Sequence, residues 1–215
     1  MINIYCARPS KGTRTLVRTI RALGGEARRV RQRVPDAFIW GQGGGNKYEE
    51  LRRLFQGGVP VPRHTLDQIT NMPRLGRTFH HTQARDLLNP HRIIPDFWVE
   101  RVDTVREHRI HVFDGRVIRV QTKQPTPGAE PHPWIRSESS GWTLVARPDL
   151  TALVPRGARD IAKRAVSALG YDYGAVDLAV KPDGSVIVWE VNTQPGLGDG
   201  TAGVYARILM QKYGG

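Results

Sequence analysis

Three oxygen-bearing side chains near the C-terminus, Asp177, Glu190 and Asn192, have the types and spacing of ligands for one divalent metal ion. Residues 175–181 alternate between apolar and small or polar side chains, which predicts a half-buried strand. The residues at 181–184, Lys-Pro-Asp-Gly, are typical of a turn, and a second strand is predicted from 186 to 192. Glu190 and Asn192 are two residues apart and share a face, and a hairpin loop of two or four residues places Asp177 on that face too. We therefore expect two carboxylates and a carboxamide to converge.

Hard oxygen ligands of this kind suit Mg2+, which keeps water ligands and bridges to nucleotide phosphates. The alternative is an edge hairpin whose acids are simply solvated. Asp177 and Glu190 are surrounded in sequence by Val, Ile, Leu and Trp, where an ionised carboxylate without a cation is costly. This context favours the metal site.

The segments GAVDL (174–178) and EVNTQPGL (190–197) resemble, in order and spacing, the ATP-grasp enzymes, most of which are ATP-dependent carboxylate-amine ligases. The sequence is similar to the ligases that add glutamate to a ribosomal protein tail, and more so to the short ATP-grasp proteins encoded by tailed bacteriophages. The resemblance implies ATP as cofactor and implies that Asp177, Glu190 and Asn192 hold its Mg2+ ions, with Mn2+ as an alternative ion.

The composition agrees with a cytoplasmic enzyme. The chain has 215 residues, of which 39% are hydrophobic, enough for a substantial core. Cys6 is the only cysteine, which excludes an intramolecular disulfide and a cysteine-rich zinc module. The apolar run at the N-terminus is too short for a signal peptide and no segment has the length of a membrane span, so we expect no membrane partner.

The net charge is strongly positive: 32 Lys and Arg against 20 Asp and Glu give +12, with a pI near 10.5. ATP uses only part of such a field, which favours a polyanionic partner, either an acidic peptide tail or a nucleic acid. General solubility is the competing explanation. The basic residues are spread along the chain, with one dense run at Arg28, Arg29, Arg31 and Arg33.

The predicted fold class is α/β (α+β): an ATP-grasp fold in which two α+β lobes grip the nucleotide, preceded by a short Rossmann-like N-terminal layer. Residues 1–58 form that layer, since a strand at 1–6, a helix at 13–23 and a strand at 37–40 follow one another. An extended linker, Val-Pro-Val-Pro, opens the small lobe at 59–99, and residues 100–215 form the large lobe with the metal site. The glycines at 41–45 either cradle an anion with their N–H groups or act as a flexible connector.

In the family, a basic residue and a glycine-rich loop of the small lobe close over the phosphates. The resemblance puts Arg77 at the basic position and brings His81 close to phosphate, while Ala84 stands where relatives tend to have glycine. A surface histidine without function is the alternative for His81.

A strand at 96–103 joins the lobes in the family and forms the hinge that holds adenine. By that resemblance Glu100, Arg101 and Val102 line the adenine slot, and Asp103 binds the ribose.

The segment EHRIHVFDGRVIRVQTK (107–123) predicts two strands joined by an Asp-Gly turn and also resembles the family. The resemblance places Arg109 and Lys123 around the transferred phosphate, where charge builds up on oxygen. D-alanine ligases carry an arginine at the position of Ala175, so Arg109, Arg119 or Arg136 would have to take that role. The loop at 134–142, which contains Arg136, is expected either near the acceptor site or as a plain surface loop.

These expectations predict an ATP-dependent ligase that joins a carboxylate substrate to an amine acceptor, such as a peptide or protein tail, through an acyl phosphate. Two alternatives use the positive charge: a basic nucleic-acid-binding protein on a degenerate ATP-grasp scaffold, and a ligase that modifies a nucleic-acid or virion component. A kinase that phosphorylates a hydroxyl is weaker, because the relatives form acyl phosphates.

Overall fold

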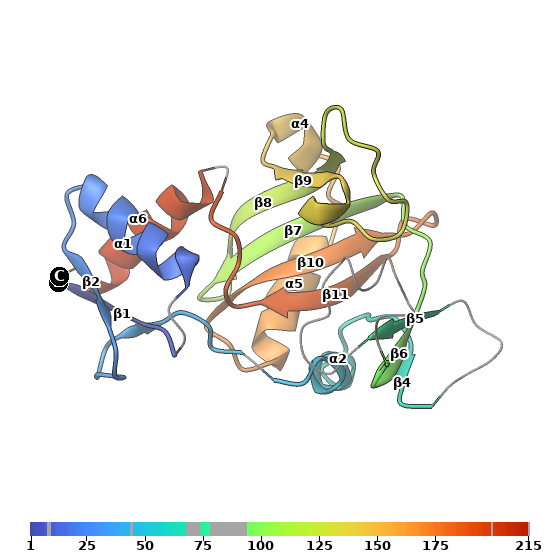
Figure 1. Cartoon of the computed structure of the whole chain (residues 1–215), viewed down its shortest axis with the longest axis horizontal. Coiled ribbons are helices and arrows are strands. Elements are labelled where there is room, and N and C mark those ends of the chain that lie inside the picture. The colour runs from blue at the N-terminus through green and yellow to red at the C-terminus, as the bar shows by residue number, and fades with distance from the viewer. Residues whose placement is uncertain (8–9, 44, 68–73, 78–93, 199, 215) are drawn as a thin grey trace. The chain divides into compact units, whose positions relative to one another are not determined.

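The computed structural model describes residues 1–7, 10–43, 45–67, 74–77, 94–198 and 200–214 (Figure 1). The chain divides into two units: Met1–Gly44 with Asn192–Gly215, and Gly45–Val191. The domain boundaries expected at residues 58 and 99 stay predictions. Among the described residues, none of the helices has the length and apolarity needed to cross a membrane.

The first unit contains a parallel sheet with the strand order β2-β1-β3 and two helices. Its elements are β1 (Ile2–Tyr5), α1 (Lys11–Ala22), β2 (Ala27–Val30), β3 (Phe38–Ile39) and α6 (Thr201–Tyr213). Ser10 caps α1 by accepting a hydrogen bond from the Thr13 N–H, and α1 packs against α6. The expected order of strand, helix and strand is present, and β2, which covers part of the basic run, is an additional strand.

The core of the first unit joins the two ends of the chain. Ile4 of β1 and Ile20 of α1 are fully buried, and the buried Trp40 ring packs edge-on against Tyr205 of α6, with 5.7 Å between ring centroids. The C-terminal helix therefore completes the core of the N-terminal layer.

The second unit is built on a five-stranded sheet with the order β11-β10-β7-β8-β9, in which β10, β7, β8 and β9 pair antiparallel. The strands are β7 (Arg106–Phe113), β8 (Arg116–Pro125), β9 (Trp142–Val145), β10 (Tyr173–Val180) and β11 (Val186–Asn192). Asp114 and Gly115 both have positive φ (46° and 69°), as a two-residue hairpin turn requires, so the predicted Asp-Gly turn is confirmed.

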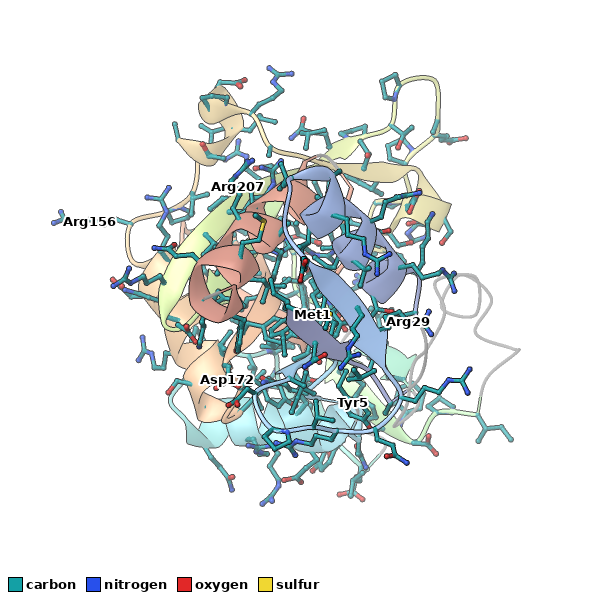
Figure 2. The ribbon with its side chains drawn as sticks, turned by 90° about the vertical axis from the view of Figure 1, so that its left-hand side faces the viewer. Met1, Tyr5, Arg29, Arg156, Asp172 and Arg207 are labelled. Carbon is teal, nitrogen blue, oxygen red and sulfur yellow. The ribbon has the colours of Figure 1, made fainter. Side chains whose placement is uncertain are left out.

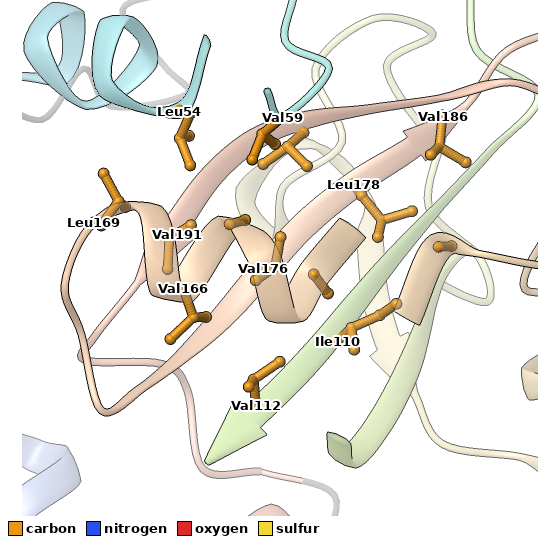
Figure 3. Packing of buried hydrophobic residues seen from close by; sticks show 14 of the residues in the cluster. Leu54, Val59, Ile110, Val112, Val166, Leu169, Val176, Leu178, Val186 and Val191 are labelled. Carbon is orange, nitrogen blue, oxygen red and sulfur yellow. The ribbon is translucent and has the colours of Figure 1, made fainter. Parts of the chain in front are cut away.

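Helix α5 (Ala158–Ala168) covers one face of this sheet and encloses the main core (Figure 3). Ile110 and Val176 project from β7 and β10 toward Ala162 and Val166 of the helix, and all four are buried. The short helices Glu138–Ser140 and α4 (Pro148–Thr151) lie in the connections around β9. Because successive side chains of a strand point to opposite faces, the apolar face fixes which residues the other face presents.

A smaller antiparallel sheet with the order β4-β6-β5 and helix α2 (Lys47–Gln56) complete the second unit. Its strands are β4 (His64–Thr65), β5 (Arg74–Arg77) and β6 (Phe97–Glu100). Leu51 of α2 packs with Phe97 and Val99 of β6 in a small buried cluster. His81 and Ala84 lie outside the described residues.

Candidate functional site

The face of the large sheet opposite α5 carries charged side chains on its central strands. The register pairs Arg109 of β7 with Asp177 of β10, while their neighbours Ile110 and Val176 point into the core. Glu107 of β7 lies on the same face as Arg109, since the two are two residues apart. We call this surface the charged face; it contains Arg109 and Lys123, which the resemblance assigns to phosphate chemistry.

Arg109 and Asp177 form a two-pronged ion pair. Arg109 donates from Nε to Oδ1 over 2.6 Å and from a terminal nitrogen to Oδ2 over 2.7 Å. Their side chains are only 15% and 8% exposed, so solvent screens the pair weakly. Ala175, the position that carries arginine in D-alanine ligases, lies opposite His111 in the same strand pair.

A second ionic group on this face surrounds Glu107. Lys123 Nζ lies 2.8 Å from Glu107 Oε2, and Arg136 Nε lies 3.8 Å from Glu107 Oε1. Arg136 also donates to the Thr104 carbonyl and lies over the Trp142 ring, 4.7 Å from its centroid. The structure therefore brings Lys123 and Arg136 to one carboxylate, with Arg109 on the neighbouring position of the same strand face.

The hairpin that carries the predicted metal ligands differs from the expected one. Lys181 N–H donates to the Ser185 carbonyl and Gly184 (φ 80°) N–H donates to the Lys181 carbonyl, so the loop has three residues instead of two or four. A three-residue loop followed by regular strands would put Glu190 on the face opposite Asp177. The expectation about loop length is wrong.

An irregularity in β11 restores the predicted face. Val188 and Val191 both belong to the core cluster, and both N–H groups point away from β10, to the Pro60 carbonyl and to the Glu50 carboxylate. In a regular strand, residues three apart point their side chains to opposite faces and their N–H groups to opposite edges. Since Val188 and Val191 share both, the alternation of β11 shifts by one residue between them, as in a β-bulge. Glu190, next to Val191, then lies on the charged face.

Glu190 is surrounded by cations from the small sheet and α2. Lys47 Nζ lies 3.1 Å from Glu190 Oε2, and a terminal nitrogen of Arg77 lies 4.0 Å from the same oxygen. Lys47 also lies 3.5 Å from Glu50 Oε2, and Glu50 accepts a hydrogen bond from the Val191 N–H. Burial alone lowers the pKa of Lys47, but the carboxylates of Glu190 and Glu50 outweigh it and raise that pKa.

Lys47 and Glu50 are residues that the sequence reasoning missed. They lie three apart on a short helix and carry no motif of their own. Burial is the largest cause of the raised pKa of Glu50, which the Lys47 charge only partly offsets. Their relation to Glu190 comes from the packing of α2 beside β11, which sequence spacing does not encode.

The residues predicted to hold adenine and ribose lie at the end of β6 and just after it. Glu100 is the last residue of β6 and pairs with Arg63, whose Nε lies 3.4 Å from its carboxylate. Arg101 lies over the Trp134 ring, 4.2 Å from its centroid, while Val102 is half-buried and Asp103 exposed in the connection that leads to β7. The contacts expected with a nucleotide stay predictions.

The chemistry of the donor set fits a magnesium ion that takes part of its ligands from phosphate and water. Asp177 and Glu190 offer hard oxygen atoms, and each pairs with a cation, Arg109 and Lys47 respectively. Within the described residues, no three His, Cys, Asp or Glu side chains cluster as a metal cage. One or two carboxylates are what Mg2+ uses when it also binds nucleotide phosphates. Asn192, predicted as the third ligand, is the half-buried last residue of β11.

Two buried arginine nitrogens in the second unit fit an anion. Arg77 Nε and Arg136 Nε are buried and have no hydrogen-bond acceptor within the part of the chain that the structure describes. Leaving a buried donor unpaired costs about 1–3 kcal/mol, and more for a charged group. Phosphate oxygens would satisfy both nitrogens.

The glycine segment after β3 is held within the first unit. Gly41 N–H donates to the Thr193 carbonyl, and Gly43 N–H donates to the Thr193 hydroxyl over 3.0 Å. These two N–H groups are therefore already paired, which favours a structural role for this segment over an anion cradle.

No protein-family model matches the sequence, and no curated protein matches it. Among solved structures it is similar to the ATP-grasp ligase PsnB complexed with a minimal precursor, at 15% identity over 98% of each chain with a TM-score of 0.65. A PsnB complex that also contains Mg and ADP matches at 14% identity over 98% of this chain and 97% of that one, with a TM-score of 0.64.

Two other ligases match over nearly their whole length. The macrocyclase MdnC from Microcystis aeruginosa, bound with precursor peptide MdnA, has 13% identity over 97% of this chain and 99% of that one, with a TM-score of 0.60. D-alanine–D-alanine ligase from Bacillus anthracis has 12% identity over 98% and 95%, with a TM-score of 0.59. The chain therefore has the ATP-grasp fold, and the predicted fold class is confirmed.

Proposed function

We propose that this protein is an ATP-dependent carboxylate-amine ligase that forms an amide bond through an acyl phosphate. The observation that carries the proposal is the charged face, where Arg109, Lys123 and Arg136 stand beside the acids Asp177 and Glu107 on one side of the sheet. The ATP-grasp fold of its structural neighbours supports it, since those neighbours are ligases by name.

The proposed reaction needs positive charge and positioning and does not need a nucleophilic side chain. A carboxylate oxygen of the substrate attacks the γ-phosphorus of ATP, giving an acyl phosphate and ADP. The amine nitrogen then attacks the acyl carbon, phosphate leaves, and the nitrogen loses a proton. Arg109, Lys123 and Arg136 would hold the transferred phosphoryl oxygens and offset the charge that develops on them.

Asp177, Glu190 and Asn192 would hold Mg2+, or Mn2+ in its place, and the bound ion supplies neutralisation of the phosphate oxygens. Arg109 and Lys47, which pair with Asp177 and Glu190, would lie beside the phosphate oxygens and offset part of their charge.

Nucleotide binding in this proposal uses residues of the small sheet and the connection after it. Arg77 and His81 would contact phosphates, Glu100, Arg101 and Val102 would line the adenine slot, and Asp103 would bind the ribose. The unpaired, buried Nε of Arg77 supports the first of these roles. The PsnB complex with Mg and ADP supports the choice of ATP and Mg2+.

The acid and the amine acceptor are proposed to include a peptide or protein segment. Two of the neighbours, PsnB and MdnC, were solved with precursor peptides, and this supports a peptide as substrate. D-alanine–D-alanine ligase, a neighbour named for a smaller substrate, supports only the general class of reaction.

The test is calorimetric titration of the purified protein with a nonhydrolysable ATP analogue, with and without Mg2+, beside the variant Asp177→Ala/Glu190→Ala. We expect magnesium-dependent binding in the wild type and its loss in the variant. The control is Asp149→Ala/Asp160→Ala, which removes the same charge from two exposed ion pairs and should bind like the wild type. Equal magnesium-dependent binding by all three proteins would refute this metal site.

A further inference from the structure

The first unit carries a groove of about 480 Å³ between α1 and β2 whose charged lining consists of arginine alone. The apolar part of the lining is Val17 and Val30. Among the residues that the structure describes, no acidic or aromatic side chain lines it. The five arginines are Arg14, Arg18, Arg21, Arg29 and Arg31.

Two elements arrange these arginines in two rows. Arg14, Arg18 and Arg21 follow one another at intervals of four and three residues on α1, which forms a stripe about 10 Å long. Arg29 lies in β2, and Arg31 follows directly after Val30, the last residue of that strand. Figure 2 looks toward this unit and labels Arg29.

Within the described residues, none of the five arginines forms an ion pair, whereas Arg109, Arg147 and Lys123 each pair with an acid. Arg21 Nε donates a hydrogen bond to the Ala27 carbonyl. Like charges three or four apart on a helix destabilise it by about 0.2–0.5 kcal/mol per pair. An anion bound in the groove would offset this repulsion.

The spacing of the arginines indicates which kind of anion the groove binds. Duplex nucleic acid carries one negative charge per about 3.4 Å of axis on each strand, so about 10 Å of duplex presents about three phosphates of the facing strand to the groove. An extended acidic peptide turns every second side chain to one side, at about 7 Å intervals, and presents about two carboxylates over the same length. The phosphate backbone is therefore the better match.

The lining also indicates how the anion is contacted. Guanidinium groups bind phosphate through two parallel N–H donors, and arginine is the cation best suited to this geometry. Since the groove has no aromatic side chain, it offers no platform on which bases could stack. Contacts of this kind position a nucleic acid without reading its sequence.

We propose that this arginine groove binds the phosphate backbone of a nucleic-acid duplex without base recognition. The site lies entirely within the first unit and does not depend on ATP or on the charged face.

The test measures binding of a short labelled duplex of mixed sequence by fluorescence anisotropy across a series of salt concentrations. In the full chain, Arg14→Gln/Arg18→Gln/Arg29→Gln removes three cations and keeps good helix formers on α1. We expect its affinity to be at least about tenfold weaker and the slope of log K against log salt to fall by about 2 to 3, since each neutralised phosphate contributes about 0.9.

The matched control removes the same charge from the second unit. Arg116, Arg156 and Arg159 surround another basic pocket, and replacing all three with Gln should leave affinity within about threefold of the wild type. Equal loss in both triple variants would overturn the proposal in favour of a diffuse field, and so would no binding by the wild type at low salt. Displacement of the duplex by a glutamate-rich peptide of equal charge as readily as by unlabelled duplex would assign the groove to acidic peptides.

Discussion

Asp177 and Arg109 illustrate why a single residue can be important for both stability and function. Taking both charges out of water is costly, and the two short hydrogen bonds return enough of that cost only while both partners are present. Removing one partner leaves the other charge without the ion pair that offsets its loss of solvation. Replacing both with apolar residues of similar size avoids that penalty, so the two roles can be separated by experiment.

The first prediction uses this difference. Asp177→Ala should lower the free energy of unfolding by about 3 kcal/mol, because the Arg109 guanidinium is left buried without its carboxylate. Arg109→Met/Asp177→Leu should recover most of that loss, since neither charge remains. Urea unfolding at pH 7 measures both.

Magnesium-dependent nucleotide binding should be absent from both of these variants. The double variant is the more informative of the two, because we expect it to be nearly as stable as the wild type although it lacks the Asp177 carboxylate, the proposed metal ligand. If it bound nucleotide as the wild type does, the Asp177 carboxylate would have only a structural role.

The second prediction concerns Glu50, the buried acceptor for the Val191 N–H. Glu50→Ala should lower the free energy of unfolding by about 1–3 kcal/mol, because the Val191 N–H loses its hydrogen-bond acceptor on the outer edge of β11. Glu50→Gln keeps a carbonyl oxygen for the N–H and should recover part of the loss. Thermal unfolding of the three proteins checks the order.

Glu49, the adjacent residue, provides the control for this series. It pairs with Arg52 on the exposed side of α2, where an ion pair contributes little, so Glu49→Ala should behave like the wild type. Equal destabilisation by Glu49→Ala and Glu50→Ala would mean that α2 is sensitive to any lost charge.

At the scale of the element, β10 and β11 show what alternation in a sequence can and cannot predict. The apolar residues Val176 and Leu178 identify the strand and the face of Asp177 correctly. The loop length and the bulge were not predictable, because they depend on a left-handed Gly184 and on partners outside the hairpin, Pro60 and Glu50. The loop length and the inferred bulge offset one another in the position of Glu190, and the metal site itself stays a prediction.

The third prediction concerns the two buried histidines of β7. His108 Nδ1 is hydrogen-bonded to the Thr122 hydroxyl, and its buried Nε2 has no partner within the described part of the chain. His111 donates from Nε2 to Gln121 Oε1. Burial lowers the pKa of each to about 4, because a proton added to either ring would be poorly solvated.

A folded pKa below the unfolded value of 6.5 gives stability that is fully present above pH 6.5 and is lost as the pH falls toward 4. Between pH 7 and pH 5, each histidine should therefore lower the free energy of unfolding by about 2 kcal/mol. His108→Asn/His111→Gln replaces the donor nitrogens with amide N–H groups and cannot be protonated. The difference in urea unfolding free energy between the two pH values should therefore be smaller in this variant, and an unchanged difference would show that other groups cause the loss.

At the scale of the whole molecule, the first unit is formed from both ends of the chain. The strand and helix patterns of residues 1–40 predicted the strand, helix and strand of the N-terminal layer. The sequence gives no signal that Tyr205 meets Trp40, because a contact between residues so far apart depends on the path of everything between them. Local periodicity predicts elements, whereas their partners follow from tertiary packing.

The last prediction tests whether the two units unfold separately. Tyr205 is fully buried, so Tyr205→Ala leaves a cavity next to Trp40 and should cost about 3 kcal/mol or more. Hydrogen exchange should then speed up in β1 and α1, which share this core, while β7 and β10 keep their protection, since their core is the cluster under α5. Arg207→Ala, at an exposed position two residues along the same helix, should change neither region. If Tyr205→Ala speeds exchange equally in β1 and β10, the whole chain opens as one cooperative block, and the division into two units describes its geometry alone.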